Sequence, residues 1–136
     1  MSSFFANQGF LIDTIVHLSP QEAFLAIGRG AVLVDLRDDQ EISLKRFDVG
    51  NILYISNVSG DEPKISLSKL SRKAPLILAD SVGLRSKEAA IFLKKQGYDV
   101  ANLIGGIVEW QRDGLPMQID GFLTGSCACR LRPRKT

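Results

Sequence analysis

Residues 75–97 read PLILADSVGLRSKEAAIFLKKQG, and this stretch determines the predicted fold. It begins with a short apolar run of the length and composition of a strand that is covered on both faces. A loop containing Gly83 follows, and residues 85–96 then place apolar side chains at helical spacing. Gly97 stands where such a helix ends. The stretch therefore predicts a buried strand, a short loop and a helix.

The same alternation continues through the rest of the chain. Ser19, Pro20 and Glu22 form a capping box at the start of a helix that ends at Gly28 or Gly30. Strand and helix alternate about five times, which favours a mostly parallel sheet with helices on both faces, an α/β fold. Strands are predicted at residues 14–16, 31–36, 51–55, 75–79 and 100–103, a turn at 60–63, and further helices at 38–44, 65–70 and 107–112.

The length and composition are those of one globular domain. The chain has 136 residues, of which 45% are hydrophobic and 24% are charged, which excludes disordered and collagen-like proteins. No apolar run approaches the length of about 18 residues that a membrane span requires. We predict a flexible N-terminus at residues 1–10, a folded domain at 11–117 and a C-terminal tail at 118–136.

The predicted location of the protein is the cytoplasm. The N-terminal stretch has no early Lys or Arg, and Asp13 interrupts its apolar residues, so it does not resemble a secretory signal. The chain has only two cysteines, Cys127 and Cys129, which are too few and too close together for a disulfide framework.

Basic residues are concentrated at the C-terminus. The net charge is +2, but residues 130–136 carry four positive charges, and the rest of the chain has 13 basic and 15 acidic residues. The folded domain therefore offers no basic surface for nucleic acid, and no nucleic-acid or membrane partner is predicted. The basic tail alone predicts only weak, salt-sensitive attraction to anions.

Two polar segments follow predicted strands and mark a candidate site. Ligands of open parallel sheets bind beyond the carboxyl ends of the strands. One segment is Asp35-Leu36-Arg37, whose charged side chains either pair with one another or line the cleft. The other is the loop that leads into the long helix, where backbone N–H groups would hold an anion and a terminal arginine would add charge. Its residues are Asp80, Ser81, Val82, Gly83, Leu84, Arg85 and Ser86.

Several motifs in this order resemble the rhodanese-like family. They are the segment Val34–Arg37, the loop ending in Gly83-Leu84-Arg85-Ser86, and the run GYDVANLIGG at residues 97–106, with Trp110 four residues further on. The resemblance covers residues 15–115. It implies five parallel strands with flanking helices, and an activity of sulfane-sulfur transfer through a cysteine persulfide, with cyanide, a thiol or a protein partner as acceptor.

The chain departs from that family at the position on which the chemistry depends. The family's active loop reads Cys, two residues, Gly, one residue, Arg, and Asp80 stands at the position of the cysteine. A thiolate attacks sulfur and holds a persulfide, whereas a carboxylate does neither. Related phosphatases also need a cysteine, in a loop one residue longer. Residues 46–51 differ as well, because only Gly50 matches the family pattern there, which predicts a remodelled surface loop.

Asp80 has three alternative roles. Its carboxylate can occupy the N–H cradle as a permanent internal anion and helix cap. It can instead bind a cation or a cationic group of a partner. A third possibility is a nucleophile for phosphoryl or acyl transfer, but the acidic partners that would bind magnesium are not evident in the sequence. Ser81 and Ser86 are predicted to cap the helix start, and neither has a His partner for a hydrolase triad.

The pair Cys127 and Cys129 is the second candidate site. Cysteines one residue apart bind soft metals or exchange disulfides, but two ligands do not complete a zinc site. The only histidine, His17, is predicted near a strand end. The tail is long enough to return to the loop, where Arg130 would favour a thiolate. The alternative is an exposed tail pair that is inert or merely redox-labile.

The sequence thus supports two hypotheses of different class. The first is a rhodanese-like protein with a disabled sulfurtransferase site that acts as a binding or regulatory module. The second is a sulfurtransferase or sulfur carrier that uses Cys127 or Cys129. We predict no cofactor and no metal, a small anion, a thiol or a protein as partner, and a monomer or weak dimer.

Overall fold

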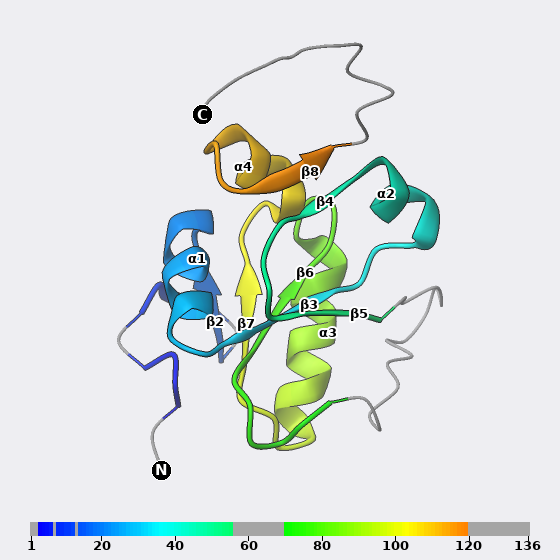
Figure 1. The fold of residues 1–136 in the computed structure, drawn as a ribbon. Coiled ribbons are helices and arrows are strands. Elements are labelled where there is room, and N and C mark those ends of the chain that lie inside the picture. The colour runs from blue at the N-terminus through cyan, green and yellow to red at the C-terminus, as the bar shows by residue number, and fades with distance from the viewer. Residues whose placement is uncertain (1–2, 7, 13, 56–69, 120–136) are drawn as a thin grey trace.

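The computed structural model describes residues 3–6, 8–12, 14–55 and 70–119 (Figure 1). The predicted turn at 60–63 and almost all of the helix predicted at 65–70 lie outside this range. The other predicted elements are present, with ends that differ by a few residues at most. In chain order, the elements are β1 (Phe10–Ile12), β2 (Ile15–Leu18), α1 (Pro20–Gly28), β3 (Val32–Asp35), α2 (Asp39–Leu44), β4 (Lys45–Phe47), β5 (Ile52–Tyr54), β6 (Leu76–Ala79), α3 (Leu84–Lys95), β7 (Val100–Leu103), α4 (Gly106–Arg112) and β8 (Met117–Ile119).

The central sheet has the strand order β1-β2-β7-β6-β3-β5. Strands β2, β7, β6, β3 and β5 are parallel, and β1 pairs antiparallel with β2 through a turn in which Thr14 has a φ of 67°. The predicted α/β class with a mainly parallel sheet is confirmed. The sixth strand, β1, was not predicted because it has only three residues, all exposed, and so gives no alternating pattern.

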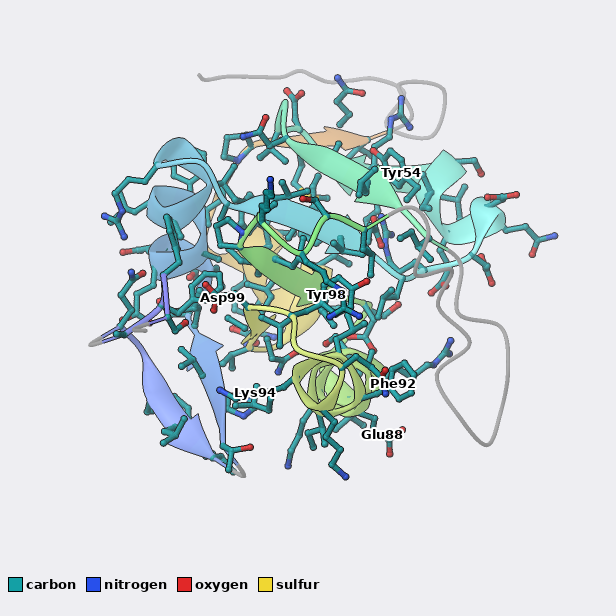
Figure 2. The ribbon with its side chains drawn as sticks, turned by 90° about the horizontal axis from the view of Figure 1, so that it is seen from below. Tyr54, Glu88, Phe92, Lys94, Tyr98 and Asp99 are labelled. Carbon is teal, nitrogen blue, oxygen red and sulfur yellow. The ribbon has the colours of Figure 1, made fainter. Side chains whose placement is uncertain are left out.

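Helices cover both faces of the sheet and create two hydrophobic clusters. On one face, α3 packs on β6 and β7 through Ala89, Ala90 and Leu93. On the other face, α1 and α4 pack together, and the fully buried Trp110 lies in their cluster. Figure 2 views α3 end-on, with Glu88 on the side away from the sheet. Trp110 is therefore a core residue.

A second, two-stranded sheet lies beside α4 and corrects the prediction for residues 46–51. Strand β4 pairs antiparallel with β8, so Arg46 and Phe47 belong to a strand and not to a surface loop. Phe47 is buried and meets the Trp110 ring edge-on, at 5.1 Å between the ring centroids. The sequence around β4 does not reveal this pairing, because its partner strand lies about 70 residues away along the chain.

The N-terminal segment packs on the folded domain through Phe5, which is fully buried in the cluster with Trp110. The Ser3 hydroxyl and the Phe4 N–H both donate to the carboxylate of Asp99, which precedes β7 and is labelled in Figure 2. Part of the segment predicted to be flexible, residues 1–10, thus contributes to the core. The limits of the three predicted regions stay predictions. Among the described residues, no helix is both long and apolar enough to cross a membrane.

Candidate functional site

The loop between β6 and α3 lies at the carboxyl end of the parallel strands. Figure 1 shows this end of the sheet next to α4, with β4 and β8 close by. Strand β6 ends at Ala79, Asp80 follows at once, and α3 begins at Leu84. The loop is held in place by contacts with α2 on one side and α4 on the other.

The carboxylate of Asp80 is turned into the loop. One oxygen accepts the Gly83 N–H, the other accepts the Arg85 N–H at 2.9 Å, and the Ser86 hydroxyl lies 3.4 Å from the first oxygen. The residue is only 5% exposed. Because Gly83 at the N-cap position has no side chain, Asp80 supplies the cap for α3. The site thus holds an internal anion where the sequence places an anion-binding cradle.

Ser81 and Ser86 do not cap the helix, which corrects the prediction for both. The Ser81 hydroxyl donates to the carboxylate of Glu41 at 2.7 Å. The Ser86 hydroxyl, which is fully buried, donates to the side-chain oxygen of Asn102 at 2.5 Å. Asp80 already accepts two N–H groups at the start of α3, so the hydroxyls bond to other elements.

Glycines let α4 approach the loop closely. The N–H of Ile107 donates to the carbonyl of Asp80 at 2.9 Å, and that of Val108 donates to the carbonyl of Ser81 at 3.2 Å. Gly106 has a φ of +59°, and a Cβ there would lie 2.4 Å from the Asp80 carbonyl oxygen. The first turn of α4 therefore holds the backbone of the loop, and only glycine fits at position 106.

Asp35 and Arg37 form a buried ion pair, one of the two arrangements that the sequence allows. The Arg37 guanidinium donates to the Asp35 carboxylate through two nitrogens, the closest contact being 2.9 Å. It also lies 5.7 Å from the centroid of the Phe47 ring. Arg37 borders the site, whereas Asp35 does not line the cavities described below. On the neighbouring strand, burial raises the pKa of Tyr54, and the Asp35 charge raises it further.

Two cavities open at the loop. The first, of about 260 Å³, is lined by Asp80, Val82, Leu84 and Arg85, together with the residues that it shares with the second cavity. The second, of about 360 Å³, lies between α2, α4 and β8 and has a more apolar lining. They share three lining residues, which are Arg37, Glu41 and Ser81. Val82 and Leu84 line the first cavity and are themselves exposed.

A buried polar chain connects the loop with β2 and was missed by the sequence analysis. Ser86 bonds to Asn102 in β7, and the Asn102 amide nitrogen lies 3.1 Å from Nδ1 of His17 in β2. All three residues are buried. The one signal in the sequence is Asn102, a polar residue within an otherwise apolar strand, because a buried amide requires hydrogen-bond partners.

The described part of the chain offers no evident place for a metal. Among these residues, no group of three or more His, Cys, Asp or Glu side chains is arranged to hold an ion. Cys127 and Cys129 lie outside the described residues, so the structure does not test their role. At the loop itself, the two Asp80 oxygens accept the N–H groups of Gly83 and Arg85, which leaves a cation little access to them.

A parallel sheet with helices on both faces and an anion-holding loop after β6 defines a rhodanese-like α/β protein. The chain belongs to this family: the model of the rhodanese-like domain matches residues 19–113. The predicted family and fold are thereby confirmed.

Individual relatives include proteins that are named as sulfurtransferases. The chain is 35% identical to the thiosulfate sulfurtransferase GlpE of Actinobacillus succinogenes over 103 residues, which is 74% of this chain and 88% of the relative. It is 32% identical to the probable adenylyltransferase/sulfurtransferase MoeZ of Mycobacterium tuberculosis, but covers only 25% of that protein. Among solved structures, the polysulfide-sulfur transferase homodimer of Wolinella succinogenes has a TM-score of 0.65 at 26% identity, covering 76% of this chain and 78% of that one.

Proposed function

We propose that this protein is a rhodanese-like binding or regulatory module that does not transfer sulfur at position 80. The observation that carries the proposal is the Asp80 carboxylate, which accepts the N–H groups of Gly83 and Arg85 in the loop. In the family motif, a cysteine precedes the glycine by three residues and the arginine by five, and Asp80 has this spacing.

The chemistry of the two side chains differs at each step of sulfur transfer. A thiolate attacks the outer sulfur of thiosulfate, a persulfide bond forms, the sulfur–sulfur bond of the donor breaks, and sulfite leaves. A carboxylate has no sulfur with which to form that bond. The charge of Asp80 also opposes an anionic donor, because it lies among the N–H groups that would otherwise bind the donor.

The binding partner in this proposal is a small anion, a thiol or a protein. A small anion would have to use the outer rim of the first cavity, where Arg85 lies, because Asp80 fills the inner donors. No cofactor or metal is part of the proposal. A monomer or weak dimer in the cytoplasm is the expected state, and sedimentation velocity would test the oligomeric part.

The experiment compares sulfur loading in matched variants that carry Cys127→Ser and Cys129→Ser, so that position 80 alone differs. Each protein is incubated with thiosulfate, and its intact mass is measured. We expect no gain with Asp80 and no gain with the control Asp80→Ser. For Asp80→Cys we expect a gain of one sulfur, about 32 Da, as a persulfide. Loading of the protein that retains Asp80 and lacks both cysteines would refute the proposal.

The alternative function, a sulfur carrier that uses Cys127 or Cys129, is favoured by the position of β8. Ile119 at the end of β8 lines the second cavity, which shares Arg37, Glu41 and Ser81 with the cavity of Asp80. Cys127 follows eight residues later, which allows an extended reach of about 27 Å. A gain of about 32 Da in the otherwise unmodified protein, lost in Cys127→Ser or Cys129→Ser, would establish this alternative.

A further inference from the structure

We infer that the two cavities beside the loop form a docking groove for a protein segment that carries an apolar side chain and, close to it, a carboxylate. The inference deepens the proposed binding function and rests on it. The apolar side chain would enter the second cavity, and the carboxylate would pair with Arg85 at the mouth of the first. The two cavities are neighbours, because Arg37, Glu41 and Ser81 line both of them.

The second cavity offers an apolar anchor site. Leu44 of α2, Val108 of α4 and Ile119 of β8 line it, and each of these side chains is 39–50% exposed. They come from three different elements and converge on one space of about 360 Å³. Burying such surface under an apolar side chain is favourable, and a site of this kind is where interface energy concentrates.

The charged side chains that line the groove differ in whether they already have a partner within the protein. The Arg37 guanidinium is paired with Asp35, and the carboxylates of Glu41 and Asp80 accept hydrogen bonds from groups of the protein. Lys45 donates to the neutral amide of Gln111. Within the part of the chain that the structure describes, the Arg85 guanidinium has neither an ion pair nor a hydrogen bond. At Arg85 the groove therefore presents an unpaired cation that complements a carboxylate of the segment.

The exposed surface around the cavities favours a protein segment over a small molecule. Leu84 is 71% exposed and Val82 is 52% exposed, and both lie on the rim next to Arg85. A molecule within one cavity would leave these side chains in water, whereas a polypeptide that crosses the groove can cover them. The rim is held in place, since Ser81 bonds to Glu41 and to the first turn of α4. A preorganised surface loses less entropy on binding.

The test uses a random peptide library displayed on phage, selected on the Cys127→Ser/Cys129→Ser protein without any sulfur donor. We expect the selected peptides to share a Leu, Ile, Met or Phe with an Asp or Glu a few residues away. Binding of a selected peptide is then measured by fluorescence anisotropy. Leu44→Glu and Val108→Glu, on separate helices, should each weaken it at least about tenfold, as expected for a lost anchor contact.

Controls separate this inference from its alternatives. Leu25→Glu, an exposed substitution on α1 away from the groove, should leave binding unchanged. Arg85→Glu should weaken binding of the acidic peptide. The same variant should bind a form of the peptide in which Lys replaces the acidic residue, whereas the parent protein should bind that form weakly. The inference would be overturned if the selected peptides lacked an acidic residue. It would also be overturned if Leu44→Glu and Val108→Glu bound the peptide as tightly as the parent protein does.

Two other occupants of the groove are distinguished in the same assay. If deletion of residues 121–136 strengthens peptide binding tenfold, the tail of this chain is the occupant and the inference is wrong. If the protein is a dimer that Val108→Glu converts to a monomer, a second copy is the occupant. If the deletion leaves the peptide affinity unchanged and the protein is a monomer, the occupant of the groove is a separate partner protein. If the protein that retains Asp80 and lacks both cysteines gained sulfur from thiosulfate, the proposed function would be refuted. The peptide-binding results would not be affected by that outcome.

Discussion

At the scale of single residues, the ion pair of Asp35 and Arg37 stabilises the fold and also lies beside the site. Both side chains are almost completely buried. Arg37→Met leaves the Asp35 charge without its partner and should destabilise the fold by about 3–5 kcal/mol. The double variant Asp35→Asn with Arg37→Met removes both charges, and the Asn side chain keeps an acceptor for the backbone N–H of residue 37. Its loss of unfolding free energy should therefore be smaller than the sum of the losses in the two single variants. Urea unfolding followed by Trp110 fluorescence measures this, and additive losses would contradict it.

A second residue-scale prediction concerns the glycine that lets α4 hold the loop. Gly106→Ala places a Cβ against the backbone of Asp80 and Ser81, so it should destabilise the protein and shift the amide signals of the loop. Gly114→Ala is the matched control, because Gly114 also has a positive φ but open space around its Cβ position. The control should cost about 1 kcal/mol from backbone strain, and Gly106→Ala clearly more. Equal losses in thermal unfolding would show that the close approach of α4 is not what requires glycine.

The residue scale also shows how far the sequence predicts the site. The loop, Asp80 and the ion pair could be predicted because each depends on residues close together in the chain. The bonds of Ser81 and Ser86 could not, because their partners, Glu41 and Asn102, lie 40 and 16 residues away. A serine hydroxyl forms its hydrogen bond with whichever polar group the fold brings near, and the local sequence does not contain that information.

At the scale of elements, local signals predict the ends of helices better than they predict edge strands. The capping box at Ser19 and Glu22 begins α1 as expected, because its hydrogen bonds join residues three apart. Strands β4 and β8 have three residues each and depend on each other across the chain. Short strands of this kind have too few positions for a period of two to be recognised.

The capping box gives an element-scale prediction for pH. The N–H of Ser19 lowers the pKa of Glu22, burial partly opposes this, and the Ser19 hydroxyl and the Gly9 N–H lower it further. The charged carboxylate therefore stabilises the fold above its ordinary pKa of about 4.3, and this contribution is lost as the pH falls through the lowered value. Glu22→Gln should be less stable than the parent at about pH 7, and the difference should shrink at about pH 3. Urea midpoints at both pH values test this, and a difference that grows in acid would contradict it.

At the scale of the whole molecule, the two ends of the sheet have separate tasks. The loop of Asp80 lies at the carboxyl end, together with α4 and the two cavities. The N-terminal segment bonds to Asp99, which precedes β7 and so lies at the amino end. Changes at the amino end should therefore alter stability and leave the geometry of the loop intact.

Phe5 provides the test of this separation. Phe5→Ala removes a fully buried ring from the cluster that contains Trp110, and should cost about 3–5 kcal/mol. Phe10→Ala is the control: its ring is 51% exposed and stacks on His17, so the loss should stay below about 1 kcal/mol. Unfolding in urea gives both values, and amide spectra of the folded Phe5→Ala protein report on the loop. The amides of Gly83 and Arg85 donate to Asp80 and so report on the loop. If their signals shifted as much as those of the amides around Asp99, the amino end of the sheet and the loop would be coupled, which would contradict the separation of tasks.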